Sequence, residues 1–147
     1  MSEPESGFAQ LDGERPALVP PGTYDVSFCG FATFILFGRA SKLNVQFKIL
    51  TFGEHFEKRI SRYYNVARII GRPGPNGRFK CGFSSDFLRE YAKLFPAPTR
   101  LDRIPMSSFE KHIFTAKVRT VEKGSQQEAI PDCLRYSVIS ELIAIKQ

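Results

Sequence analysis

The sequence predicts a mainly β domain that contains a single helix. Three observations lead to this prediction: apolar and polar residues alternate in several segments, one apolar stripe has helical spacing, and glycines and prolines separate these segments. Alternation with a period of two places one set of side chains in the core and the other set on the outer face of a sheet. At 147 residues, the chain has the length of one domain with a substantial core.

Residues 1–19 differ in composition from the rest of the chain. Their charged residues are mostly acidic: Glu3, Glu5, Asp12 and Glu14 against Arg15. Glycine and proline are interspersed, and no periodicity is present. Because such a segment buries too little apolar surface to offset its ordering entropy, we expect an acidic flexible tail over residues 1–19 and the folded domain over residues 20–147.

The first three predicted strands run from Thr23 to about Phe37, from Lys42 to Thr51 and from Phe56 to Val66. Gly30 interrupts the first strand near its middle, which predicts a bulge or a sharp bend. A turn over residues 38–41 leads into the second strand. In that strand, buried positions alternate with polar ones: Leu43, Val45, Phe47 and Ile49 against Lys42, Asn44, Gln46 and Lys48.

A segment rich in glycine and proline follows, and then the helix. Residues 68–82 contain an Asn76-Gly77 pair that predicts a tight turn, and they lack the residue order of a phosphate-binding loop. We expect either a basic hairpin or lid that closes over a bound strand, or a solvated loop. Ser84-Ser85-Asp86 begins a helix whose apolar stripe faces the core and which ends before Pro96.

Two further strands complete the predicted domain. They run from His112 to Glu122 and onward from Leu134, joined by a polar connection at residues 123–127. The alternation slips at residues 139–143, which indicates a bulge or a strand end. Three strands, one α-helix and two strands is the order of an OB-fold-like domain, a five-stranded Greek-key barrel with its helix between strands 3 and 4. An SH3-like barrel would not account for a full helix.

Basic residues gather between Arg39 and Lys80. This segment holds ten Lys or Arg against Glu54 and Glu57, in a chain whose net charge is +6. OB-folds present their second and third strands to oligonucleotides, and a nucleic-acid strand needs cations for its phosphates and aromatic rings for its bases. We therefore predict non-catalytic binding of single-stranded nucleic acid. The predicted contact residues are Arg39, Lys42, Lys48, Lys58, Arg59, Arg62, Tyr63, Arg72, Arg78, Lys80, Lys117 and Arg119.

Two neighbouring tyrosines on the third strand are expected to have different roles. Because successive side chains on a strand point to opposite faces, Tyr64 is placed towards the core and Tyr63 outward. Arg62 then falls on the inward side, which requires a rim position or a bulge.

Several short motifs resemble those of small OB-fold single-stranded-DNA-binding proteins encoded by phages and plasmids. The motifs are Pro-Pro-Gly-Thr-Tyr-Asp-Val at 20–26, Arg-Tyr-Tyr-Asn-Val at 62–66, Phe-Glu-Lys at 109–111 and Leu-Arg-Tyr-Ser-Val-Ile at 134–139. The resemblance implies an accessory role in the replication, recombination or transfer of a mobile element. It adds no catalytic residue, and it is compatible with a homo-oligomer and with a replication or recombination protein as partner.

Other classes of protein find little support in the sequence. His55 and His112 lack metal-binding spacing, and the carboxylates are not clustered as a magnesium-dependent nuclease requires. We expect no enzyme activity, metal or cofactor. No run of 18 apolar residues indicates a membrane span, and three scattered cysteines indicate reduced thiols in the cytoplasm. The alternative function is a protein-binding adaptor barrel that recognises an acidic partner through the same basic face.

Overall fold

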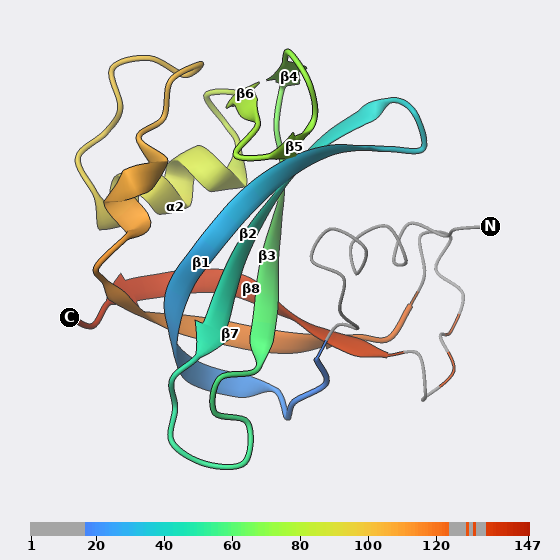
Figure 1. Cartoon of the computed structure of the whole chain (residues 1–147), viewed down its shortest axis with the longest axis vertical. Coiled ribbons are helices and arrows are strands. Elements are labelled where there is room, and N and C mark those ends of the chain that lie inside the picture. The colour runs from blue at the N-terminus through green and yellow to red at the C-terminus, as the bar shows by residue number, and fades with distance from the viewer. Residues whose placement is uncertain (1–16, 124–128, 130, 132–134) are drawn as a thin grey trace.

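The computed structural model describes residues 17–123, 129, 131 and 135–147. Five long strands pair in a closed ring, which Figure 1 shows: β1 (Gly22–Leu36), β2 (Ala40–Ile49), β3 (Arg59–Asn65), β7 (Ile113–Val121) and β8 (Tyr136–Ile145). β1 pairs with both β2 and β7, and β8 closes the ring between β7 and β3. The β3–β8 contact is parallel, and the other pairings in the ring are antiparallel. The predicted mainly β architecture is confirmed.

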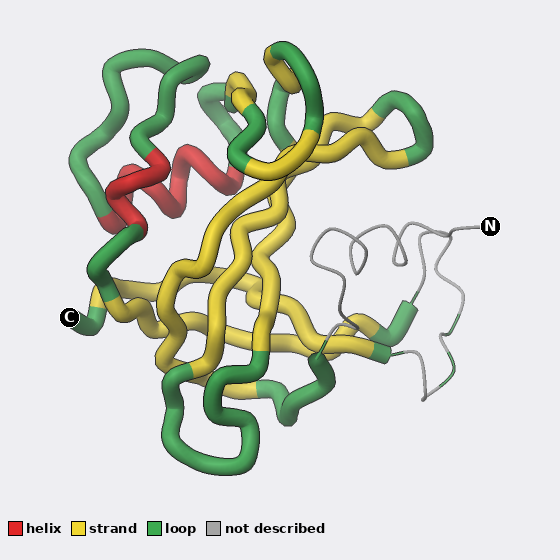
Figure 2. The backbone as a smooth tube through the Cα atoms, viewed as in Figure 1, coloured by secondary structure: helices red, strands yellow, loops and turns green. Residues whose placement is uncertain are grey.

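The remaining elements lie between β3 and β7 in the sequence. They are β4 (Arg68–Ile70), β5 (Gly74–Pro75), β6 (Arg78–Lys80), the helix α2 (Asp86–Leu94) and the 3-10 helix η1 (Met106–Phe109). β4 and β6 form a small two-stranded sheet, and β5 pairs with β1. Figure 2 shows these short strands and the helix gathered at one end of the molecule. We call residues 68–80 the β4–β6 lobe.

The lobe is the predicted hairpin, but its turn differs from the prediction. The Gly77 amide donates to the Gly74 carbonyl over 3.0 Å, and Asn76 has a φ of 56°. The central pair of the turn is therefore Pro75-Asn76 and not Asn76-Gly77. A Cβ at Gly77 would lie 2.1 Å from Thr33 Oγ1, so glycine is required for the lobe to approach β1 this closely.

Strand boundaries differ from the predictions around two turns: β2 begins two residues earlier than expected because the first turn is shorter, and β3 begins later because a second turn takes residues assigned to it. Phe37 and Gly38 have φ values of 56° and 72°, and the Arg39 amide donates to the Leu36 carbonyl over 3.1 Å. The β1–β2 connection is thus a two-residue turn at Phe37-Gly38, and β2 begins at Ala40. β3 begins three residues later than expected, since tight turns occupy residues 53–58.

Bulges occur in β1 and in β8, the two strands whose sequence pattern is irregular. The β1–β2 register shifts between Phe28 and Gly30, as the glycine predicted. The β7–β8 register shifts twice, at Ser140 and at Ile143, while β8 continues to Ile145. Of the two interpretations of residues 139–143, the bulge is correct.

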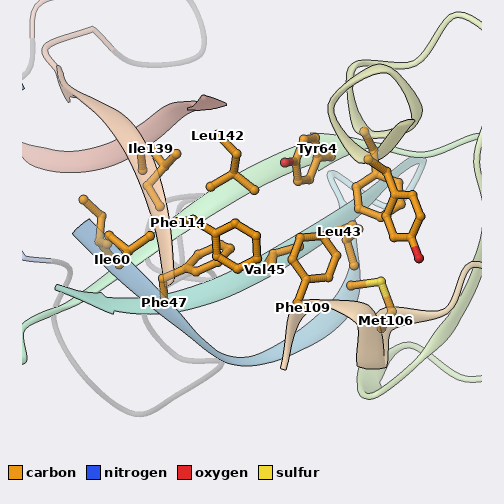
Figure 3. Packing of buried hydrophobic residues seen from close by; sticks show 14 of the residues in the cluster. Leu43, Val45, Phe47, Ile60, Tyr64, Met106, Phe109, Phe114, Ile139 and Leu142 are labelled. Atoms are coloured by element: carbon orange, nitrogen blue, oxygen red, sulfur yellow. The ribbon is translucent and has the colours of Figure 1, made fainter. Parts of the chain in front are cut away.

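The core fills the ring and continues beneath the helix. Figure 3 shows side chains from β2, β3, β7, β8 and η1 pointing toward one another. The predicted buried positions of β2 are all confirmed, each with 0% exposure: Leu43, Val45, Phe47 and Ile49. Phe109 of η1 joins the two parts, with its ring centroid 6.4 Å from that of Phe47 and 5.8 Å from that of Tyr91 on α2.

The helix has the predicted cap and the predicted apolar face. Ser85 Oγ accepts a hydrogen bond from the Leu88 amide over 3.2 Å, which satisfies one of the amides left unpaired at a helix start. Phe87 and Tyr91 are buried, and Pro96 follows the last turn. In the part of the chain that the structure describes, no helix is long and apolar enough to cross a membrane.

The described domain begins earlier than composition suggested. The Ser137 amide donates to the Ala17 carbonyl over 2.8 Å, and the Val19 amide donates to Ser137 Oγ over 2.8 Å. Val19 is 2% exposed. Residues 17–19, which composition assigned to the tail, therefore pack on β8. The rest of the predicted tail, residues 124–127 of the predicted polar connection, and Cys133 lie outside the described residues.

Candidate nucleic-acid interface

The side of β2 and β3 that points away from the core carries the polar residues that the sequence placed there. Lys42, Asn44, Gln46 and Lys48 pair with Asn65, Tyr63, Ser61 and Arg59, in that order. We call these eight residues the outer face. Tyr64 pairs with Leu43 and is 3% exposed, so the predicted parity of the two tyrosines is confirmed.

Two cations on the outer face lie directly opposite each other. Lys48 pairs with Arg59 across the two strands, and within the described residues neither forms an ion pair with a carboxylate. Like charges in directly opposite positions destabilise a sheet. The exposed Lys58 comes directly before Arg59, at the end of the adjoining loop, with its Nζ 3.1 Å from His55 Nδ1. This end of the outer face therefore concentrates positive charge that no carboxylate of the described residues pairs with.

Aromatic rings lie at the other end of the outer face. Tyr63 packs edge-to-face against Phe34 of β1, with ring centroids 6.4 Å apart and an interplanar angle of 89°. Lys42 is opposite Phe34 in the β1–β2 register, and its Nζ donates to Asn65 Oδ1. Aromatic rings beside cations are the combination with which proteins hold single-stranded bases and phosphates.

Asn44 departs from the sequence prediction that it would be displayed on the polar face. It is 1% exposed, and neither its Oδ1 nor its Nδ2 has a hydrogen-bond partner within the described residues. A buried polar group without a partner costs about 1–3 kcal/mol. Asn44 is opposite Tyr63 in the register. The outer side of the sheet therefore has, next to Tyr63, an amide donor and acceptor without hydrogen-bond partners among the described residues.

The tip of the β1–β2 hairpin carries a residue that sequence reasoning missed. Phe37 is 58% exposed and has a φ of 56°, a left-handed conformation that a bulky side chain rarely adopts. The exposed Arg39 lies two residues further along the chain. Figure 1 shows this tip extending away from α2. The signal in the sequence was a Phe-Gly pair where two-residue hairpins favour Asn-Gly.

A second missed aromatic residue lies in the β2–β3 loop. Phe52 is 95% exposed between Lys48 and Lys58 of the chain, and Phe56 in the same loop is 46% exposed. The signal in the sequence for an exposed ring was an aromatic residue beside Gly53, in a segment without a periodic apolar pattern. Both exposed loops that adjoin β2 thus present a phenylalanine and a basic residue.

Arg62 does not belong to this interface, because its guanidinium points into the molecule. Its side chain is 12% exposed, and its Nε and Nη2 donate to the buried carboxylate of Glu90 on α2. Its Cζ lies 4.3 Å from the centroid of the Tyr64 ring. The predicted phosphate contact at Arg62 is therefore wrong. The side chain points inward, and the Glu90 carboxylate on the helix neutralises its charge there.

The carboxylate of Glu90 accepts hydrogen bonds from two further groups besides Arg62. Tyr64 Oη donates to Glu90 Oε1 over 2.9 Å, and the Leu142 amide donates to the same oxygen over 3.1 Å. Burial and the neighbouring carboxylate raise the pKa of Tyr64 well above its ordinary value, which keeps its hydroxyl as a donor. Burial alone would lower the pKa of Arg62, but the hydrogen bonds with Glu90 raise it overall. The cluster joins α2 to β3 and β8.

The other predicted contact residues fall in two places. Arg72, Arg78 and Lys80 are exposed on the β4–β6 lobe. Lys117 and Arg119 are exposed on β7, where Lys117 pairs with Thr23 at the start of β1. Thr23 lies eleven positions before Phe34, on the order of 35 Å along β1, and four positions before Ser27, the β1 partner of Lys48. The structure thus brings Lys42, Lys48, Arg59 and Tyr63 together on β2 and β3, whereas Lys117 and Arg119 lie on β7, two strands from β2 and from β3 in the ring.

No group of three or more His, Cys, Asp or Glu residues that could hold a metal ion is present in the described parts of the chain. Comparisons with protein-family models, with curated proteins and with solved structures find no match for this chain. The function is therefore inferred from the geometry of the chain itself.

Proposed function

We propose that this chain is an OB-fold-like protein that binds single-stranded nucleic acid, without catalysis, through its outer face. The order of the elements supports the fold: three long strands precede the helix, two follow it, and the third strand meets the fifth in parallel. OB-folds use the faces of their second and third strands for oligonucleotides. Those positions correspond to β2 and β3 here.

The observation that carries the proposal is that one face holds the Lys48–Arg59 pair at one end and aromatic rings at the other. Four carboxylates elsewhere in the described chain form exposed ion pairs with basic residues: Asp25 with Lys146, Asp86 with Arg89, Asp102 with Arg100 and Glu141 with Lys93. Among the described residues, no carboxylate forms an ion pair with Lys48 or Arg59. A strand of nucleic acid would supply phosphates to this pair and bases to the aromatic residues at once.

Single-stranded DNA is the form that we propose, with the accessory role in a mobile element that the resemblance implies. An acidic protein partner would neutralise the cations, but it would not use the adjacent Tyr63 and Phe34 rings or the exposed Phe37 and Phe52. The two kinds of partner therefore differ in what they do to the aromatic residues.

The test compares oligo-dT of several lengths with poly-glutamate of matched charge, using gel shift and tyrosine fluorescence. The chain has no tryptophan to mask its five tyrosines. We expect affinity for oligo-dT to rise with length until the site is filled, and tyrosine emission to fall because bases stack on the rings. Poly-glutamate that binds as tightly as oligo-dT, with no length-dependent quenching by DNA, would favour the acidic-partner adaptor instead.

A further inference from the structure

A cavity of about 380 Å³ lies between the β4–β6 lobe and residues 102–106. Its volume falls within the range of about 300–1,000 Å³ that is typical of small-molecule sites. Figure 1 shows the lobe and the segment before η1 at the same end of the molecule, beside α2. This cavity is separate from the outer face of β2 and β3.

The floor of the cavity is apolar and its rim is basic. Phe31, Phe79, Ile104 and Met106 provide the apolar lining, and the ring centroids of Phe31 and Phe79 lie 6.5 Å apart in an edge-to-face arrangement. Arg78 and Arg103 are exposed lining residues. The charge at the rim therefore favours an anion, and the floor favours a flat apolar group.

Asp102 also lines the cavity, but its charge is already matched. Arg100 Nε and Nη2 donate to the two oxygens of Asp102 over 2.9 and 2.8 Å. These hydrogen bonds hold the pKa of Asp102 below its ordinary value, so the carboxylate stays paired with Arg100. Arg78 and Arg103 form no ion pair within the described residues.

Hydrogen bonds from the surrounding elements fix the walls. The Asn76 amide donates to the Phe31 carbonyl over 3.0 Å, and the Cys81 amide donates to the Leu101 carbonyl over 3.0 Å. Tyr91 Oη donates to the Pro105 carbonyl over 2.8 Å. The lobe, β1, the segment before η1 and α2 are thus tied together, so a ligand would meet a preformed site.

We propose, building on the function proposed above, that this cavity holds one nucleotide of the bound strand. Its base would lie against Phe31 and Phe79, and its phosphate would lie at Arg78 and Arg103. β5 pairs with β1 and so extends the β3–β2–β1 sheet by one strand toward the cavity. Phe31 precedes Phe34 by three residues, about 10 Å along β1, and its side chain lies on the opposite face of the strand, with that of Val45. A strand that contacts both rings would therefore pass around the β5 edge of the sheet.

The experiment uses Met106 as a reporter inside the cavity. The chain has two methionines, Met1 and Met106, so methyl-labelled methionine gives two NMR signals, and Met106→Leu identifies the one from the cavity. The probes are dTMP, deoxyribose phosphate, which lacks the base, and an oligo-dT of about 15 nucleotides. We expect dTMP and oligo-dT to shift the Met106 signal through the ring current of the base, and deoxyribose phosphate to shift it much less.

Charge variants supply the second readout. Arg103→Gln should weaken the binding of dTMP about tenfold through loss of a charge-assisted hydrogen bond, while the matched control Arg72→Gln, on the same lobe but outside the cavity lining, should leave it unchanged. If oligo-dT quenches tyrosine emission while Met106 is unmoved by oligo-dT and by dTMP, the cavity assignment is overturned and the proposed function stands. If oligo-dT does not bind at all, the proposed function fails. The shift of the Met106 signal on adding dTMP then decides whether the cavity binds a nucleotide.

Discussion

The two sides of β3 carry the same kinds of side chain in opposite electrostatic settings. On the inner side, Arg62 and Tyr64 both hydrogen-bond to the buried Glu90 of α2. On the outer side, Arg59 lies opposite Lys48, and Tyr63 packs against Phe34. The inner arginine and tyrosine have a carboxylate partner in Glu90, whereas the two opposed outer cations have none among the described residues.

The difference follows from the cost of charge in each environment. A buried guanidinium without a counter-charge would cost several kcal/mol, so a fold that buries Arg62 must also supply Glu90. Exposed like charges repel weakly because water screens them. The outer arrangement is therefore tolerated in the free protein, and a polyanion would make it favourable.

The largest effect is expected on the inner side, at Glu90. Glu90→Ala leaves Arg62 buried without its counter-charge and removes the acceptor of Tyr64 and Leu142, which should lower the free energy of unfolding by about 3–5 kcal/mol. Urea titration followed by circular dichroism measures this loss. Glu141→Ala is the control: it breaks the exposed pair with Lys93 and should cost no more than about 1 kcal/mol. Equal losses in the two variants would contradict the structural role of the Glu90 cluster.

Next in size is the contrast between the two tyrosines. Tyr64→Ala should destabilise the fold by about 2–4 kcal/mol, because it removes a core aromatic ring. Tyr63→Ala should change stability little and weaken single-strand binding roughly tenfold or more, since stacking on one ring is worth about 1–3 kcal/mol. Thermal unfolding and oligo-dT titration separate the two effects. Exchanged phenotypes would mean that the β3 register is wrong by one residue.

A smaller effect of opposite sign on stability and binding is expected at Lys48. Lys48→Glu converts the like-charge pair with Arg59 into an opposite-charge pair, which should stabilise the sheet by about 0.2–1 kcal/mol. The same change places a negative charge on the face proposed to hold phosphates, so oligo-dT affinity should fall further than in Lys48→Ala. If the Lys48→Glu variant is more stable and still binds as tightly as the wild type, the Lys48–Arg59 pair is not part of the interface.

The smallest expected effect on stability lies at the tip of the β1–β2 hairpin. Phe37→Asn replaces a strained residue by one that accepts positive φ, and it should stabilise the hairpin by up to about 1 kcal/mol. If the exposed ring stacks on a base, oligo-dT affinity falls at the same time. Phe37→Tyr is the matched control, because it keeps both the ring and the strain. Unchanged affinity in Phe37→Asn would show that the ring is not a contact.

The sequence was most informative where the pattern is local. Alternation in β2 identified its four buried residues, and Ser85 with Pro96 bounded the helix closely. The parity of Tyr63 and Tyr64 followed from the same period of two. These features depend on neighbours in the chain, and the sequence displays them directly.

Features that depend on distant residues could not be predicted in the same way. Glu90 is 28 residues from Arg62 in the sequence, and its helical position gave no sign that it would be buried against β3. Asn44 looked like an ordinary outer-face residue, and only the packing around it shows that its amide is covered and has no hydrogen-bond partner among the described residues. Lys117 and Arg119 have the right charge, but they lie on β7, with β1 between them and β2 and with β8 between them and β3.

The salt dependence of oligo-dT binding tests the central claim most directly. With three to five phosphate contacts, each contributing about 0.7, the logarithm of the association constant should fall with the logarithm of salt concentration at a slope of roughly −2 to −4. The double variant Lys48→Ala/Arg59→Ala should reduce the magnitude of this slope by about 1.4, and Lys117→Ala/Arg119→Ala should leave it unchanged. A wild-type affinity that does not vary with salt, or an equal change in both double variants, would contradict the assignment of the outer face as the binding surface.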